Sequence, residues 1–104
     1  MRVRRLGGTV ERLVLPIFYF DIREGETFYE DDEGIEMADL DAAEQEAAES
    51  AASIGRDRLP KRHARDVTIE VRNAHKQRVC TVTVAMTMER VDPEPVSRLL
   101  KLVS

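Results

Sequence analysis

The acidic bend at residues 31–34 is the first place where side-chain types suggest chemistry. It reads Asp31-Asp32-Glu33-Gly34, so three carboxylates precede a glycine that permits a sharp reversal. Calcium takes about six to eight oxygen ligands, often around such a turn. Calcium loops of the EF-hand type place ligands at every second residue, and this bend does not. The pattern favours a solvated turn over a cation site, and it leaves Asp31, Asp32 and Glu33 as a candidate docking surface.

A second candidate surface lies on the strand that precedes the bend. Alternation over residues 17–23 puts Tyr19, Asp21 and Arg23 on one face. Asp21 and Arg23 could bind a polar ligand or pair with charges on a neighbouring strand, and we favour a structural ion pair or a dimer contact. Tyr19 could stack on a ligand, although half-buried tyrosines are common in sheets.

A basic segment is the best candidate for contact with an anionic partner. Its cationic residues are Arg56, Arg58, Lys61, Arg62 and Arg65. These side chains could contact phosphates. However, no aromatic residues alternate with them to support binding of a single strand. We favour a solvated linker that docks on the acidic region of the same or a neighbouring molecule, with Arg62 and Arg65 as candidate contacts.

The remaining reactive side chains predict no catalytic, cofactor or metal site. His63 and His75 lie in expected loops beside cationic residues, and neither has a second ligand at metal-binding spacing. Cys80 has the inward parity of its strand and is interpreted as a small core residue. The sequence contains no glycine-rich phosphate loop, nucleophile elbow or histidine pair on a helix. We predict that the protein is not an enzyme.

The composition is typical of one small globular domain. Of its 104 residues, 42% are apolar and 35% are charged, so the chain can bury only a small core. The net charge of −4 argues weakly against nucleic acid as a partner without excluding it. Thirteen of the 20 acidic residues, but only one basic residue, fall between Asp21 and Glu49. This separation of charge could favour either internal closure of the chain or association between copies.

The sequence favours a cytoplasmic protein without a membrane partner. Cys80 is the single cysteine, which excludes an internal disulfide and fits a reducing compartment. No apolar run approaches the roughly 18 residues that a membrane-spanning helix needs. The basic start of the chain is not followed by the apolar segment of a signal peptide.

Alternation and helical spacing predict the first half of the fold. A strand over residues 17–23 turns Phe18, Phe20 and Ile22 inward, and short extended pieces follow near residues 27–30 and 35–37. A helix should begin at Asp39, whose carboxylate can cap the first turn, and end before Pro60. Its inward stripe is mostly alanine and is spaced for one helical face: Leu40, Ala43, Ala47, Ala51 and Ile54.

Two strands are predicted after the helix, joined by a polar loop at residues 73–77. Residues 66–72 alternate, with Val67, Ile69 and Val71 inward. Residues 78–89 should form the longest strand. Its inward residues are Cys80, Val82, Val84, Met86 and Met88. Its other face is rich in threonine, which suits a half-exposed sheet.

The resulting ββαββ order predicts an α+β domain over residues 17–90. We expect a two-layer arrangement in which one helix packs on one face of a four-stranded, mostly antiparallel sheet. Residues 1–16 should form an N-terminal extension, with the first eight or so disordered. Residues 91–104 form a tail, in which residues 96–103 have the spacing of a short amphipathic helix. The other sheet face must stay wet, be covered by a terminus or pack against another copy.

Three sequence blocks carry a resemblance to a known family. They are Phe-Tyr-Phe-Asp-Ile-Arg at residues 18–23, Asp-Glu-Gly-Ile-Glu-Met at residues 32–37, and Asp39-Leu40 before an alanine-rich helix. Together they resemble small domains of unknown function that are frequent in soil and plant-associated alphaproteobacteria. The resemblance covers about residues 17–88, and both ends of the chain fall outside its pattern. It implies no activity, cofactor or partner.

Two classes of function follow from the sequence. A one-sided sheet without a catalytic constellation favours a small interaction or regulatory module. Such a module could bind another protein, and we expect it to form a homodimer through the threonine-rich face or an exposed strand edge. The alternative is a nucleic-acid-associated regulator of the small antitoxin type. That alternative rests on the basic segment and on analogy with other strand-rich, one-helix regulators.

Overall fold

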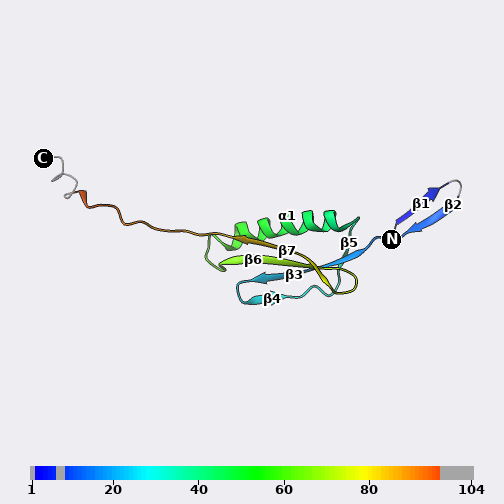
Figure 1. The fold of residues 1–104 in the computed structure, drawn as a ribbon, viewed down its shortest axis with the longest axis horizontal. Helices are drawn as coiled ribbons and strands as arrows, with labels where there is room; N and C mark the ends of the chain where they lie inside the picture. The colour runs from blue at the N-terminus through cyan, green and yellow to red at the C-terminus, as the bar shows by residue number, and fades with distance from the viewer. Residues whose placement is uncertain (1, 7–8, 97–104) are drawn as a thin grey trace.

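A computed structural model describes residues 2–6 and 9–96 of the chain (Figure 1). Near the N-terminus, β1 (Arg2–Leu6) and β2 (Thr9–Leu13) pair as an antiparallel hairpin that is separate from the main sheet. The helix α1 (Leu40–Arg58) follows three strands of the main sheet and precedes two more. These strands are β3 (Ile17–Glu24), β4 (Thr27–Tyr29), β5 (Ile35–Glu36), β6 (Asp66–Arg72) and β7 (Arg78–Ala85).

The main sheet is antiparallel throughout, in the order β4-β3-β6-β7, and β5 pairs with the first residues of β3. Ile69 of β6 lies opposite Ile22 of β3 on one side and opposite Val82 of β7 on the other. The helix α1 covers one face of this sheet (Figure 1). The predicted α+β class, with one helix on one face of an antiparallel sheet, is confirmed. The sheet has five strands instead of the predicted four, because the short extended piece near residues 35–37 pairs with β3 as β5.

The helix α1 begins at the residue that the sequence predicts. Asp39 is extended, and its carboxylate accepts a hydrogen bond from the backbone N–H of Ala42 at 2.8 Å. At the other end, the N–H of Leu59 donates to the carbonyl of Gly55 at 2.9 Å, and Pro60 follows. Asp39 and Pro60 therefore set the two limits of the helix.

The core lies between α1 and the inward residues of β3, β6 and β7. Val67, Ile69 and Val71 are at most 1% exposed, and Phe18 of β3 is also buried. On the helix side the core is alanine, with Ala43, Ala47 and Ala51 at 0% exposure. These small side chains let the helix lie close to the sheet, so that each of the larger strand side chains contributes about 1.5–3 kcal/mol by burial.

The strand β7 is shorter than predicted. It ends at Ala85, because Ala85 lies opposite Asp66, the first residue of β6. Beyond that point β6 offers no pairing partner. Met86 and Met88, which the alternation assigned to the inward face of the strand, lie after it and are 40% and 66% exposed. The predicted strand over residues 78–89 is therefore wrong in its last part.

The N-terminal extension also differs from expectation. The sequence predicted disorder over the first residues, whereas β1 and β2 pair in register from Arg2 opposite Leu13 to Leu6 opposite Thr9. Residues 1, 7, 8 and 97–104 lie outside the described residues, and so does the predicted tail helix beyond Val96. No described helix is long and apolar enough to cross a membrane.

Candidate functional site

Asp21 is at the centre of a charged cluster on the sheet face that points away from α1. Its side chain is only 4% exposed. Arg72 of β6 binds both oxygens of the carboxylate. Its Nε donates to Oδ2 at 2.6 Å, and its Nη2 donates to Oδ1 at 2.9 Å. The backbone N–H of Asp31 also donates to Oδ1 at 2.9 Å. The hydrogen-bonding capacity of Asp21 is thus used inside the chain.

Asp31 folds the acidic bend around its own carboxylate. Oδ1 accepts the backbone N–H groups of Glu33 and Gly34, each at 3.0 Å. Oδ2 accepts the N–H of Phe20 on β3 at 3.0 Å, and the Asp31 carbonyl accepts a bond from Arg72 at 2.9 Å. One aspartate therefore holds the bend in shape and fastens it to β3.

The environment of this cluster keeps both aspartates ionised. Burial by itself would raise the pKa of Asp21, but the hydrogen bonds from Arg72 and from the Asp31 N–H outweigh it and hold the pKa below its usual range. Burial likewise opposes ionisation of Asp31, and its three backbone donors lower the pKa. The hydrogen bond to Asp21 raises the pKa of Arg72. A carboxylate stabilised in this way is a poor proton donor at neutral pH.

The ring of Tyr19 is covered by the chain's own cations. Arg72 Cζ lies 5.0 Å from the ring centroid, and Lys76 Nζ lies 3.3 Å from it. Both distances are within the range of cation–π contacts. Arg23 is separate from this group, since its Cζ lies over the ring of Phe28 at 4.7 Å. The ring of Tyr19 is thus used for internal contacts.

The predicted surface of strand and bend is only partly exposed. Asp21 has the outward parity that the sequence predicts, but it is buried rather than exposed, and Asp31 is half-buried. Asp32 and Glu33 are exposed at the bend. Arg72, which closes over Asp21, was missed. The sequence signal for this contact was the position of Arg72 on the outward face of the predicted strand over residues 66–72. In the observed register Arg72 lies opposite Tyr19 of β3.

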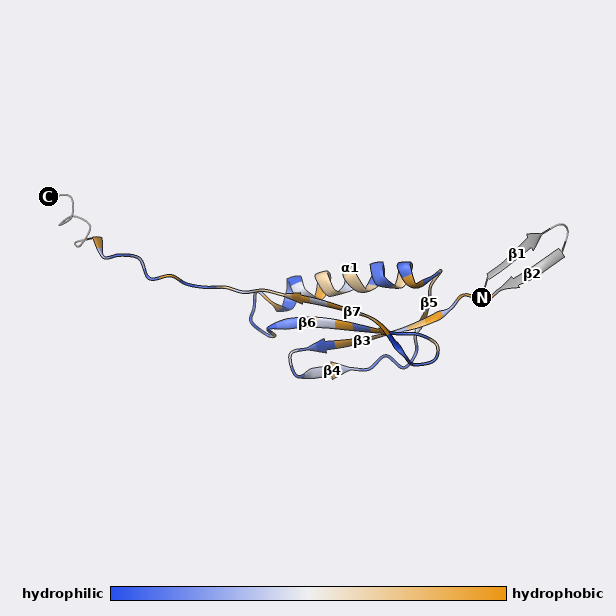
Figure 2. Cartoon of the chain, in the orientation of Figure 1, coloured by the Kyte–Doolittle hydropathy of each residue, from blue (hydrophilic) through white to orange (hydrophobic). Residues whose placement is uncertain are grey.

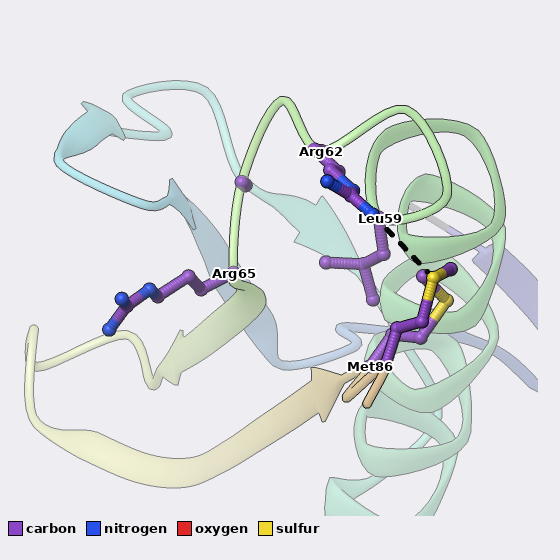
Figure 3. Close-up of a pocket in the computed structure, with 6 residues that line it drawn as sticks. Leu59, Arg62, Arg65 and Met86 are labelled. Atoms are coloured by element: carbon purple, nitrogen blue, oxygen red, sulfur yellow. Dashed lines mark hydrogen bonds between the residues drawn. The ribbon is translucent and has the colours of Figure 1, made fainter. Parts of the chain in front are cut away.

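The predicted basic contacts, Arg62 and Arg65, line a hollow of about 480 Å³ at the C-terminal end of α1 (Figure 3). Arg62 adopts a left-handed backbone (φ 58°), and its Nη2 donates to the sulfur of Met88 at 3.6 Å. The Arg65 side chain extends away from Leu59 and Met86 (Figure 3). Among the described residues no carboxylate forms an ion pair with either arginine. The full lining is Leu59, Arg62, Ala64, Arg65, Met86 and Met88.

The hollow and the acidic bend lie at opposite ends of the sheet. The segment that lines the hollow adjoins the β3–β4 turn, where the N–H of Gly25 donates to the carbonyl of Asp66 at 3.4 Å. The bend lies near the start of β3, where Ile35 pairs with Phe18. The basic segment contacts the acidic region of its own molecule through Arg58, whose Nε lies 3.4 Å from Glu24 Oε1. Arg62 and Arg65 lie far from the acidic bend, so for these two arginines a neighbouring molecule is the other predicted acceptor.

The strand β7 forms one edge of the sheet and has a free side among the described strands. It is eight residues long, whereas the opposite edge strand, β4, has three. Arg78 is its only charged residue. Natural edge strands are usually blunted by charge, proline or bulges. The register of β6 and β7 shifts between Val71 and Arg72, which leaves Val79 as an extra residue in β7, but from Cys80 to Ala85 the strand is regular and has no charge and no proline. Hydrophobic colour runs along much of β7 in Figure 2.

The histidines and the cysteine are not assembled into a site. His63 and His75 lie in turns and are exposed, and Cys80 packs against the core. Burial, with a smaller contribution from Glu44, raises the pKa of the Cys80 thiol, which disfavours the reactive thiolate. Within residues 2–6 and 9–96, no three His, Cys, Asp or Glu side chains are placed to hold a metal ion.

Comparison with protein families identifies the family of the helix-covered sheet. The model of a domain of unknown function, DUF6894, matches residues 17–85. The chain belongs to the DUF6894 family. The match begins at the first residue of β3 and ends at the last residue of β7, so the DUF6894 domain is the helix-covered sheet. Comparisons with curated proteins and with solved structures gave no match.

Proposed function

We propose that this DUF6894 domain is a small non-enzymatic interaction module that forms a homodimer through the free edge of β7. The observation that carries the proposal is an eight-residue edge strand with a single charged residue. Its unpaired backbone groups are a template for another strand. The ionised groups of the domain's other face, Asp21 and Asp31, are bound internally, which favours a binding role over acid–base chemistry.

Parity restricts how two identical β7 strands can pair. Directly opposed residues of an antiparallel pair lie on the same sheet face. In a symmetric pair of β7 strands, the twofold axis must therefore lie where one residue is opposite its own copy. An axis midway between two successive residues would oppose side chains of different faces. Pairing about Val82 sets Thr81 opposite Thr83 of the second copy. It also matches the uncharged run from Val79 to Ala85 with itself. A threonine pair of this kind already links β6 and β7, where the hydroxyls of Thr68 and Thr83 lie 2.9 Å apart.

The helices are compatible with this pairing. The helix α1 packs over both β6 and β7. A strand added ~4.8 Å beyond β7 would place the two helix axes about 10 Å apart, which is near the spacing of packed helices. The helix side nearest β7 carries small residues. Gly55 faces Val84, and the neighbouring Ala48 and Ala52 are exposed. Two such sides can approach closely without a clash.

The test is sedimentation of charge variants at the edge. The wild-type domain should be a dimer at high micromolar concentration. In Thr81→Lys/Thr83→Lys, each new lysine of one copy would oppose a new lysine of the other, so the dimer dissociation constant should rise about tenfold or more. In Thr81→Glu/Thr83→Lys the opposed charges attract if the strands pair about Val82, and dimerisation should persist.

The matched control is Thr68→Lys on β6. It removes the same hydroxyl contact and adds one lysine, against two in the edge variant, to the same sheet face on an interior strand. It should dimerise like the wild type. A wild-type monomer at high micromolar concentration, or a double-lysine variant that dimerises normally, would overturn the proposal.

We also infer a cytoplasmic location and an origin among alphaproteobacterial members of the family. The first rests on a free, half-buried cysteine as the single cysteine of the chain, and the second rests on the motifs at residues 18–23 and 32–37.

The second candidate function is a nucleic-acid-associated regulator. Its supporting observation is that Arg62 and Arg65 lack a carboxylate partner among the described residues. Binding to duplex DNA that weakens steeply as the salt concentration rises would support this function. Absence of DNA binding at low salt would exclude it.

A further inference from the structure

We infer that the hollow at the C-terminal end of α1 receives the N-terminal turn of α1 from a second copy, with Leu40 against its apolar wall and Asp41 beside Arg62. This inference rests on the proposed β7 dimer. It concerns a different part of the surface, because the hollow is lined by residues outside β7. The interface would then consist of a strand pair in the middle and one helix-end contact on each side.

The position follows from the rise of the two elements. The helix α1 and β7 run in the same direction, because β6 is antiparallel to β7 and returns along the helix. Gly55 faces Val84, so Val82, about 6.6 Å earlier, lies beneath a helix position about four residues earlier, near Ala51. A twofold axis at Val82 therefore crosses the helix pair near Ala51 and makes the two helices antiparallel. Residue 40 of one helix then lies beside about residue 61 of the other. The first helical turn of the second copy thus reaches the hollow.

The apolar surfaces at the two ends of α1 match each other. The hollow presents Met86 and Met88, which are 40% and 66% exposed, around the buried Leu59. Methionine adapts its shape to a partner. At the opposite end of the same helix, Leu40 is 39% exposed although it belongs to the predicted core stripe. Each dimer would bury two copies of this contact and cover apolar surface that the single chain leaves in water.

The charges at the two ends are also complementary. The C-terminal end carries Arg62 and Arg65 without a carboxylate partner among the described residues. The N-terminal turn carries Asp41, which is exposed, and Glu44 follows one turn later. When the α1 helices of two copies pack antiparallel, the acidic N-terminal turn of each lies beside the basic C-terminal end of the other. A parallel pair would bring like charges together, so the charges favour the antiparallel arrangement.

A charge-reversal cycle tests the contact in the full chain. Arg62→Glu and Asp41→Arg should each raise the dimer dissociation constant about fivefold to tenfold, as measured by sedimentation equilibrium. The double variant Asp41→Arg/Arg62→Glu should return it to within about twofold of the wild type, because the ion pair is restored with reversed sign. Glu49→Arg reverses a charge on the exposed side of the same helix and should leave the constant unchanged.

The outcomes separate this inference from the dimer itself. If the wild type dimerises but the two single variants bind as tightly as it does, the helix-end contact is overturned and the β7 dimer stands. If the singles weaken the dimer and the double does not recover, the two residues do not face each other, and the contact is also overturned. If the wild type is a monomer, the proposed β7 dimer is overturned, and the helix-end contact is overturned with it. Circular dichroism of each variant checks that a weakened dimer does not reflect an unfolded chain.

Discussion

At the scale of single residues, the Asp21–Arg72 pair has the largest energetic consequence. Its partners are 4% and 15% exposed at the side chain, and the guanidinium bonds both carboxylate oxygens. Desolvation offsets much of the attraction in such a pair, so its presence contributes little net stability. Removing one partner is different, because it leaves the other charge buried and unmatched. The same guanidinium also reaches the Asp31 carbonyl, which connects the pair to the bend.

Asp21→Asn should therefore lower the free energy of unfolding by about 3 kcal/mol at neutral pH, since Arg72 loses its counter-charge in a poorly hydrated place. Urea unfolding followed by circular dichroism measures the change. Glu30→Gln is the matched control. Glu30 also faces Arg72, at 3.9 Å, but its side chain is 68% exposed, and the change should stay within about 0.5 kcal/mol.

The same experiment at acidic pH checks the cause. Asp21 and Asp31 have folded-state pKa values below their ordinary value of 3.8, so the unfolded chain binds more protons in acid. Their stabilisation is complete at neutral pH and is lost as the pH falls below about 4 and through the folded pKa. The difference between wild type and Asp21→Asn should shrink over that range. A difference that is constant from neutral pH to pH 3 would point to lost packing instead of lost charge.

At the scale of elements, sequence periodicity predicted most of the fold. The alternation in β3 and β6, the Asp39 cap and the alanine stripe of α1 are local patterns, and each is found at the expected residues. Two of the errors arise where the outcome depends on a partner far along the chain. The end of β7 depends on where β6 begins, and the burial of Asp21 depends on Arg72. Of the candidate surface, Asp32, Glu33, Arg62 and Arg65 are exposed, and their role as contacts stays a prediction.

Gly34 joins the acidic bend to β5 and should tolerate no side chain. Its φ is +76°, and a Cβ there would lie 2.7 Å from Ile17 Cγ2 and 3.0 Å from Tyr19 Cε1. Gly34→Ala should cost more than about 2 kcal/mol of unfolding free energy, because strain and overlap add. Gly25→Ala is the comparison. Gly25 has a φ of +59° but only Ala64 Cβ at 3.9 Å, so the cost should be about 1 kcal/mol. Equal costs in thermal or urea unfolding would contradict the role of close contact at Gly34.

At the scale of the whole molecule, the DUF6894 domain and the N-terminal hairpin are separate sheets. The strands β1 and β2 pair with each other and with no described strand of the main sheet. The boundary lies just before Pro16, whose carbonyl accepts the N–H of Met37 at 3.0 Å. Charge is divided at the same scale, with the acidic bend at one end of the sheet and Arg62 and Arg65 at the other.

A chain that begins at Val14 should fold like the full protein. Deletion of residues 1–13 removes no strand pairing of the main sheet, so the midpoint of thermal unfolding should change by less than about 4 °C. Differential scanning calorimetry of the two chains measures it. A chain that begins at Ile17, and so lacks the Pro16 carbonyl, should be less stable than the one that begins at Val14. A large loss of stability in the Val14 chain would show that the hairpin supports the domain.

The distance in sequence between Asp21 and Arg72 also has a consequence for synthesis. Their contact spans 51 positions, and β3 obtains its long neighbour, β6, only when those positions have been translated. At roughly 5–20 residues per second, the ribosome needs about 3 to 10 seconds for this stretch. During that interval β3 can pair only with the short strands β4 and β5, and of the aromatic run Phe18-Tyr19-Phe20 only Phe18 has a partner, Ile35 of β5. The nascent chain therefore passes through a period in which its apolar strand is open to chaperones, and the emergence of β6 ends that period.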